Sequence, residues 1–240
     1  MRRKEDKTGK KTRGYILLEG GAEFGGRMAE PDKRAIELAG GLDAQVSIIP
    51  TAAVPDNNHQ RAGQSGVRWF KSLGAKQVTS LPLIDRASAD EFTIASALRR
   101  SRLIYLLGGF PQYLAQTLAG TLSWQAILEA YAAGAVIGGS SAGAMILCQH
   151  YYDPATSRIV NGLNLVLQAC VVPHHNTFGK GWASSLLPFI PDAVIIGIDE
   201  QTGLIDDSEE REWTVFGKGA VTIYKGRITA TYHSGETLSL

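Results

Sequence analysis

A serine between two glycines is the feature of this sequence with the clearest chemical meaning. Ser141 lies two residues after Gly139 and two before Gly143, where the apolar segment 135–137 meets the helix-forming segment 144–147. The pattern is typical of a nucleophile elbow, a sharp strand-to-helix turn that exposes a serine hydroxyl in strained backbone geometry. The glycines leave room for such a turn. We therefore predict that Ser141 is a nucleophile; the alternative is a glycine-rich turn that binds an anion at a helix N-terminus.

Two further glycines, Gly108 and Gly109, end another apolar segment and precede a second predicted helix. Acyl transfer requires N–H donors that point at the developing oxyanion. The N–H of Ala142, which directly follows the serine, and that of Gly109 would supply two such donors. A tight turn that needs a positive φ is the alternative explanation of the glycine pair.

A serine hydroxyl also needs a general base, most often histidine. His174 and His175 follow the apolar segment 169–172 and therefore close a predicted buried strand. Neighbouring strand residues point to opposite faces, and no third ligand has suitable spacing, so we predict no metal and no other cofactor. The remaining histidines lie in a polar loop, on the helix predicted after the elbow, and near the C-terminus: His59, His150 and His233.

Short apolar segments alternate with longer amphipathic ones along most of the chain. The fold class that this predicts is α/β, a three-layer α/β/α arrangement with a mostly parallel central sheet. The predicted strands are 15–18, 45–49, 77–81, 103–107, 135–138 and 194–198. The predicted helices are 32–39, 66–73, 90–99, 111–118, 123–132, 142–149 and 182–189. The segments 213–216, 220–224 and 227–232, separated by glycine turns, predict C-terminal antiparallel hairpins.

Composition limits the classes of partner. The 240 residues carry a formal net charge of +1, which gives no reason to expect nucleic acid, and no apolar run reaches the length of a membrane span. We predict a disordered basic tail over residues 1–13 and a single domain over 14–240, whose terminal hairpins are candidates for a homodimer interface. Cys148 and Cys170 lie in apolar surroundings and predict reduced core thiols, hence a cytoplasmic protein.

Taken together, these motifs resemble the S51 serine peptidases, a family that includes aspartyl dipeptidase (dipeptidase E) and cyanophycinase and is similar in fold to class I glutamine amidotransferases. The resemblance covers nearly the whole chain from about residue 14. It rests on Gly20-Gly21-Ala22-Glu23, Gly108-Gly109, Ser141-Ala142-Gly143-Ala144, Pro173-His174 and Gly197-Ile198-Asp199-Glu200-Gln201-Thr202.

The resemblance implies a serine hydrolase with Ser141 as the nucleophile and His174 as the base. Family members carry the triad acid between the elbow and this histidine, where the chain offers only Asp153 as a carboxylate, so Asp153 is the expected acid. A helix-ending turn is the alternative role for Asp153. The expected substrate-binding residues are Gln112, Lys180 and Glu200, with the segment 199–207 as a gating loop.

The same comparison bears on the substrate. Cyanophycinases have Asp-Gln before the histidine and several arginines after it, whereas this chain has Val172-Pro173 and only Lys180. Lysine does not reproduce the bidentate grip of arginine on a carboxylate. We therefore expect little cleavage of the β-Asp-Arg polymer, and instead cleavage of small peptides or isopeptides that contain Asp.

Two other functions remain open at this point. An α/β-hydrolase esterase could use Ser141 with Asp206 or Asp207 and His233, which has the same chain order of serine, acid and histidine. A non-catalytic amidotransferase-like module could instead bind a ligand or partner at the same place.

Overall fold

The computed structural model describes residues 13–207 and 212–240. Most of the predicted basic tail, residues 1–12, lies outside these ranges. Arg13 is described, and its guanidinium forms a 2.7 Å ion pair with the buried carboxylate of Asp206. The C-terminal end of the predicted gating segment, up to Asp207, also lies within the described residues.

The larger of two sheets has the strand order β14-β11-β10-β1-β5-β4-β2-β3 within the described residues. Strands β1, β5, β4, β2 and β3 are parallel, and β10, β11 and β14 join them antiparallel at one side. The bounds of these strands are Tyr15–Glu19 (β1), Gln45–Ile49 (β2), Gln77–Ser80 (β3), Leu103–Leu106 (β4), Val136–Ser140 (β5), Thr202–Ile205 (β10), Trp213–Gly217 (β11) and Thr237–Leu238 (β14). The predicted mostly parallel central sheet is confirmed.

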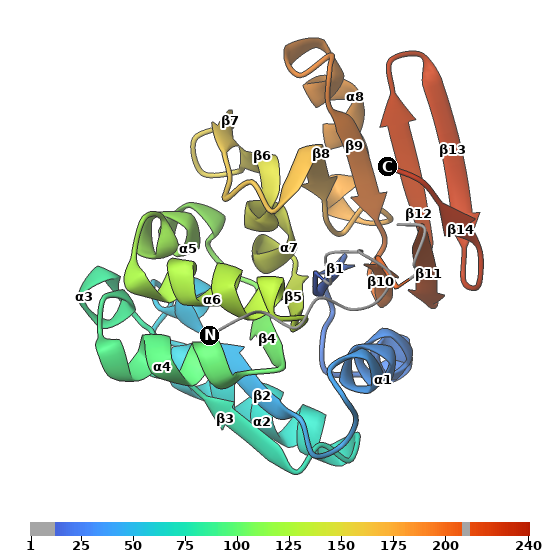
Figure 1. The fold of residues 1–240 in the computed structure, drawn as a ribbon. Coiled ribbons are helices and arrows are strands. Elements are labelled where there is room, and N and C mark those ends of the chain that lie inside the picture. Colours follow the sequence, from blue (N-terminus) through green and yellow to red (C-terminus); the bar gives the residue numbers. More distant parts are fainter. Residues whose placement is uncertain (1–12, 208–211) are drawn as a thin grey trace, which may run out of the picture.

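Helices cover both faces of this sheet, as Figure 1 shows. Ile36 of α1 and Phe70 of α2 pack with Val46 on one face, and Leu98 of α4 and Ile127 of α6 belong to the core on the other. Apolar side chains that alternate between the two faces of each strand make both cores possible. The helices are α1 (Ala29–Leu38), α2 (His59–Ser72), α3 (Arg86–Ala89), α4 (Phe92–Arg100), α5 (Pro111–Leu118), α6 (Leu122–Ala132), α7 (Ala142–Leu147) and α8 (Trp182–Leu186).

A second sheet, with the order β13-β12-β9-β8-β6-β7, was not predicted as a separate sheet. It contains the predicted hairpin of 220–224 with 227–232, whereas 213–216 pairs within the main sheet and not with 220–224. It takes in the segment 194–198, which the sequence pattern assigned to the central sheet. Periodicity identifies a strand but not its partners, and β9 pairs with β8 and β12 instead. The strands are β6 (Cys148–Asp153), β7 (Arg158–Asn161), β8 (Val166–Val172), β9 (Val194–Ile198), β12 (Ala220–Lys225) and β13 (Ile228–His233).

Helix α7 is shorter than predicted because strand β6 begins directly after it, at Cys148. The residues from 148 onward include Tyr151 and Tyr152, whose aromatic side chains favour strand. His150, predicted on the helix, therefore lies on β6, and His59, predicted in a loop, is the first residue of α2. α8 covers one face of the second sheet through Ala183 and Leu186. The other face adjoins the core of the main sheet.

The chain passes between the two sheets at places that carry the predicted functional residues. β5 of the main sheet leads through Ser141 and α7 to β6 of the second sheet, and β9 of the second sheet leads through Glu200 to β10 of the main sheet. The segment after β8 contains His174. The fold thereby brings residues that are far apart in the sequence to one junction between the sheets (Figure 1).

Candidate active site

Ser141 occupies a sharp turn between β5 and α7. Its backbone has φ 49° and ψ −112°, an unfavourable conformation for a non-glycine residue. A Cβ on Gly139 would lie 2.5 Å from the backbone of Gly143, and one on Gly143 would lie 2.2 Å from the carbonyl oxygen of Leu106. Both flanking glycines are therefore required by close backbone contact. The Ser141 N–H donates to the Glu19 carbonyl at 3.0 Å, which ties the turn to β1.

His174 lies within hydrogen-bond distance of this serine: Ser141 Oγ and His174 Nε2 are 3.0 Å apart. His174 also has a positive φ, 50°. Three contacts fix the residue. Its N–H donates to the carbonyl of Gly20 at 2.7 Å, its ring stacks on Phe178 with centroids 4.4 Å apart, and Gly21 leaves room for the imidazole. The side chain is 17% exposed, so it reaches solvent at the mouth of the site.

The carboxylate that orients His174 belongs to Glu200. Its Oε1 lies 2.8 Å from His174 Nδ1. The Glu200 N–H donates to the side chain of Asn176, and Thr177 Oγ1 donates to the Glu200 carboxylate at 3.4 Å. Hydrogen bonds therefore connect the turn after β9 to the turn after β8.

Asp153, the expected acid, does not make this contact. It is buried at the end of β6, where its carboxylate accepts from the N–H of Ala155 and from Thr156 Oγ1. These bonds close the turn between β6 and β7, so Asp153 has a turn role, but at the end of a strand and not at the end of a helix as the alternative had it. The physical reason is that β6 turns back into β7 at this point and carries Asp153 with it, while the β9–β10 connection brings Glu200 to the imidazole.

Of the two predicted oxyanion donors, Ala142 lies at the elbow, and Gly109 follows a glycine that lies close to Ser141. Ala142 is the first residue of α7, where backbone N–H groups have no partner within the helix. Gly109 has φ 137°, and a Cβ there would meet the carbonyl oxygen of Ala52 at 2.2 Å. A Cβ on Gly108 would lie 3.3 Å from Ser141 Cβ, so the glycine turn lies against this serine.

The other predicted substrate-binding residues lie on segments that follow Gly109 and His174 in the chain. Gln112 is half-buried on the first turn of α5, three residues after Gly109. Lys180 is exposed on the short helical turn Phe178–Gly181, which follows His174. The expectation of a gating loop over residues 199–207 is wrong for residues 202–205, because they form the buried strand β10.

The residues of the esterase alternative are engaged elsewhere. Asp206 pairs with Arg13 and accepts from the N–H of Ile16, and Asp207 pairs with Arg34 at 2.9 Å. His233 is exposed at the end of β13, where it pairs with Ala220. The structure does not bring these three residues to Ser141, because β13 lies at the edge of the second sheet.

A pair of buried carboxyl groups lies under the elbow. Burial and the neighbouring Asp32 raise the pKa of Glu19 well above its usual range, and burial raises the pKa of Asp32 to about 7. The Tyr105 hydroxyl donates to one oxygen of the Glu19 carboxyl group, and the Trp69 Nε1–H donates to one oxygen of Asp32. Because both pKa values are raised in the folded protein, burial favours the protonated form of these carboxyl groups.

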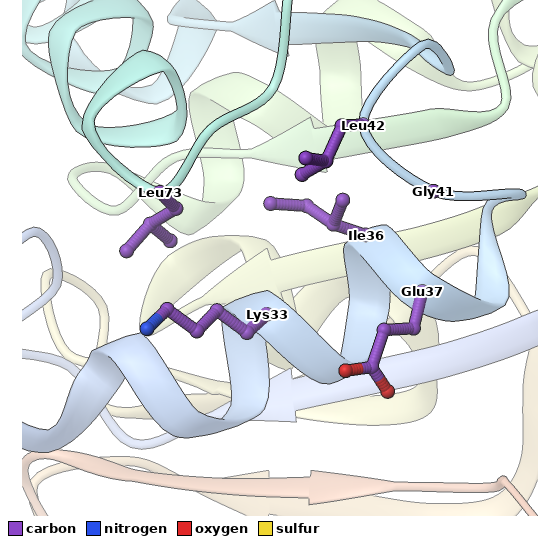
Figure 2. Close-up of a pocket in the computed structure, with 6 residues that line it drawn as sticks. All are labelled: Lys33, Ile36, Glu37, Gly41, Leu42 and Leu73. Carbon is purple, nitrogen blue, oxygen red and sulfur yellow. The ribbon is translucent and has the colours of Figure 1, made fainter.

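The pocket in Figure 2 is not part of this site. It has a volume of about 260 Å³ and lies between α1, the turn before β2 and the end of α2, with Ile36, Leu42 and Leu73 among its lining residues. This is the amino end of β2, whereas Ser141 follows the carboxyl end of β5. A second pocket, of about 380 Å³, lies at the carboxyl ends of β2 and β3.

Within residues 13–207 and 212–240, no three His, Cys, Asp or Glu side chains are grouped so as to hold a metal ion. No helix in these ranges combines the length and the apolar character needed to cross a bilayer. The arrangement instead offers a hydroxyl, an imidazole and a carboxylate in hydrogen-bonded sequence. That set can activate a serine for attack on a carbonyl carbon.

Comparisons with known proteins identify the family to which the chain belongs. The model of peptidase family S51 matches residues 16–212. Cyanophycinase from Geminocystis herdmanii is 29% identical over 235 residues, which cover 93% of this chain and 85% of the relative. The uncharacterized peptidase Lin0382 of Listeria innocua is 33% identical over 144 residues, which cover 55% of this chain and 64% of the relative.

Among solved structures, a peptidase from an acI-B1 Actinobacterium is similar over almost the entire length. The TM-score is 0.86 and the sequence identity 32%, with 96% of this chain and 98% of the other covered. The α/β architecture with two sheets is therefore shared with a known peptidase.

Proposed function

Because the chain belongs to peptidase family S51, we propose that this serine-type peptidase cleaves amide bonds of small peptides or isopeptides through Ser141, His174 and Glu200. One observation carries the proposal: the hydrogen-bonded series from Ser141 Oγ to His174 Nε2, 3.0 Å, and from His174 Nδ1 to Glu200 Oε1, 2.8 Å.

The steps follow from this series. His174 Nε2 accepts the hydroxyl proton while Ser141 Oγ attacks the scissile carbonyl carbon. The N–H groups of Gly109 and Ala142 stabilise the oxyanion, and Glu200 stabilises the imidazolium that has formed. The imidazolium then returns its proton to the leaving amine, which departs and leaves an ester on Ser141. Water, deprotonated by the same imidazole, hydrolyses that ester and regenerates the hydroxyl.

For the substrate we propose a short peptide or isopeptide that contains Asp. Lys180 supports this assignment as an exposed cation on the turn that follows His174. Binding a carboxylate without a compensating charge would cost several kcal/mol of desolvation free energy. A single lysine cannot form the bidentate contacts that an arginine cluster would offer, so cleavage of β-Asp-Arg is expected to be slow.

The nucleophile is tested by covalent labelling with a neutral fluorophosphonate. Ser141→Ala is expected to lose labelling and amide hydrolysis completely, because the attacking oxygen is gone. Ser140→Ala is the matched control and should still label, since Ser140 is buried on β5. Equal labelling of the wild type and Ser141→Ala would reject the hydrolase assignment and favour the binding-module alternative.

The same assay ranks the two candidate bases. His174→Ala should reduce turnover by about three orders of magnitude or more, as loss of a triad base does, while His233→Ala should stay within about tenfold of the wild type. The opposite ranking would support the esterase arrangement.

A further inference from the structure

The loop that connects β1 to α1 places the carboxylate of Glu23 close to Ser141. A Cβ built on Gly108 would lie 3.2 Å from Glu23 Oε1 and 3.3 Å from Ser141 Cβ, so only the space of one methyl group separates the carboxylate from the nucleophilic residue. Glu23, Gly108 and Ser141 are all partly exposed, and they therefore open to solvent at the same place.

The position of Glu23 is fixed. Ser140 Oγ donates to Glu23 Oε2 at 3.0 Å. The neighbouring residue, Phe24, packs against Tyr105 and Trp69, with ring centroids 5.9 and 6.4 Å apart. Ala22 and Phe24 both have positive φ values, 57° and 66°, which the surrounding contacts must maintain. A loop held in this way keeps the second carboxylate oxygen, Oε1, pointed at the Gly108 side.

No described hydrogen bond or ion pair engages that oxygen, and within the described residues no lysine or arginine pairs with Glu23. The other acidic groups nearby add negative charge, since Glu23 lies close enough to Glu19 and Asp32 to interact electrostatically with both. An uncompensated carboxylate beside the serine opposes the oxyanion that forms during acyl transfer. A cation bound at Glu23 would remove that opposition.

We propose that Glu23 binds a positively charged nitrogen of the substrate, an ammonium or guanidinium group, next to the scissile bond. The inference rests on the proposed function and deepens it. A peptide with an amino-terminal Asp carries both a carboxylate, which Lys180 would take, and an α-ammonium group, which Glu23 would take. Because the cation offsets the charge near the oxyanion, its binding raises the rate of acylation as well as the affinity.

The experiment compares Glu23→Gln with the wild type on matched substrates. One pair of Asp-containing dipeptide amides differs only in a free or acetylated amino terminus, and a second pair differs only in arginine or citrulline at the other position. Glu23→Gln should lower kcat/KM for the charged member of one pair by roughly 10- to 100-fold, the range of one charge-assisted contact. For the neutral partner kcat/KM should stay the same or rise, because the variant removes the charge that opposes the oxyanion. The pair that responds identifies the nitrogen.

Two fluorophosphonates, one with an aminoalkyl and one with an acetamidoalkyl tail, give a second readout that does not depend on the choice of peptide. The wild type should react faster with the cationic reagent, and Glu23→Gln should lose this preference. Glu37→Gln, an exposed carboxylate on α1, is the matched control for the loss of one charge and should keep it.

Equal losses on charged and neutral substrates, or an unchanged preference between the two reagents, would overturn the role of Glu23. Such a result would leave the proposed function intact provided that both reagents still label Ser141. Absence of labelling in the wild type would instead overturn the proposed function itself.

Discussion

Two residues of the proposed triad have a strained backbone conformation. Ser141 and His174 have φ values of 49° and 50°, a region that non-glycine residues rarely adopt and that costs of the order of 1–3 kcal/mol each. The surrounding contacts must offset that cost: the N–H of Ser141 donates to β1, and that of His174 to Gly20. Strain retained at both partners of one hydrogen bond indicates that the fold stabilises this geometry for its chemistry.

Glu200 and Asp153 can be separated by two conservative substitutions. Glu200→Gln removes the charge that stabilises the imidazolium and can leave His174 with an unsuitable hydrogen-bond partner, so kcat should fall by roughly 10²- to 10⁴-fold. Asp153→Asn keeps a side chain that can accept in the β6–β7 turn, and kcat should remain within a few-fold. Steady-state turnover measures both. A larger loss in Asp153→Asn, with the thermal midpoint unchanged, would restore Asp153 as the acid.

The loop over residues 20–26, which follows β1, contacts several parts of the site. It supplies the carbonyl of Gly20 to His174, the space above Gly21 to the imidazole, and Glu23 to the edge of the serine. Gly26 leaves room for the side chain of Gln201, beside Glu200. The loop therefore lies against His174, Gln201 and the turn that contains Ser141, although none of its own residues belongs to the proposed triad.

Gly21→Ala tests this function of the loop. Gly21 has φ 108°, and a Cβ would lie 2.2 Å from the His174 ring, so the substitution should displace the imidazole and lower kcat by roughly 10- to 100-fold. Gly40→Ala is a matched control because Gly40 has the same φ, 108°, with open space around it. Both variants should lose about 1 kcal/mol or more of stability, measured by urea unfolding. Equal activities of the two variants would contradict the steric argument.

At the scale of the whole molecule, the site lies where two sheets meet. β5 and β10 belong to the main sheet, and β8 and β9 to the second, so the relative placement of the sheets sets the distances between Ser141, His174 and Glu200. The buried pair of Glu19 and Asp32 lies beneath this junction, and its protonation is linked to folding of the entire chain.

The linkage predicts how global stability depends on pH. Both pKa values are raised in the folded state, so the folded protein keeps a proton that the unfolded chain loses above about pH 4–5. The free energy of unfolding should therefore fall as the pH rises through neutrality, with a contribution of up to about 1.4 kcal/mol per pH unit for each proton. Glu19→Gln keeps an acceptor for the Tyr105 hydroxyl and removes the titrating group at this position.

Urea unfolding between pH 5 and pH 8 measures this dependence. The decline in stability should be shallower in Glu19→Gln than in the wild type, while Glu129→Gln, whose carboxylate is a surface partner of Arg99, should follow the wild type. An equally steep decline in Glu19→Gln would mean that Glu19 does not hold the proton.

The sequence by itself determined the local features of this protein. The spacing of Gly139, Ser141 and Gly143 predicts the elbow. The physical reason is steric, because a Cβ on either glycine would lie 2.5 Å or less from neighbouring backbone atoms. The alternation of apolar and amphipathic segments predicts the parallel sheet and its two helical layers. Strands buried on both faces are short apolar runs, and the helices that cover them are amphipathic. His174 also follows from local pattern, since it closes an apolar strand.

Only the tertiary structure decided which distant groups meet. Strand periodicity does not encode partners, so the second sheet and the placement of β9 within it were missed. Asp153 was preferred as the acid from its position between Ser141 and His174 in the chain, but the β6–β7 turn holds it elsewhere. Glu200 was assigned to substrate, and the return of the chain from β9 to β10 places it on His174 instead. Contacts across sheet junctions depend on strand order, which residue spacing does not record.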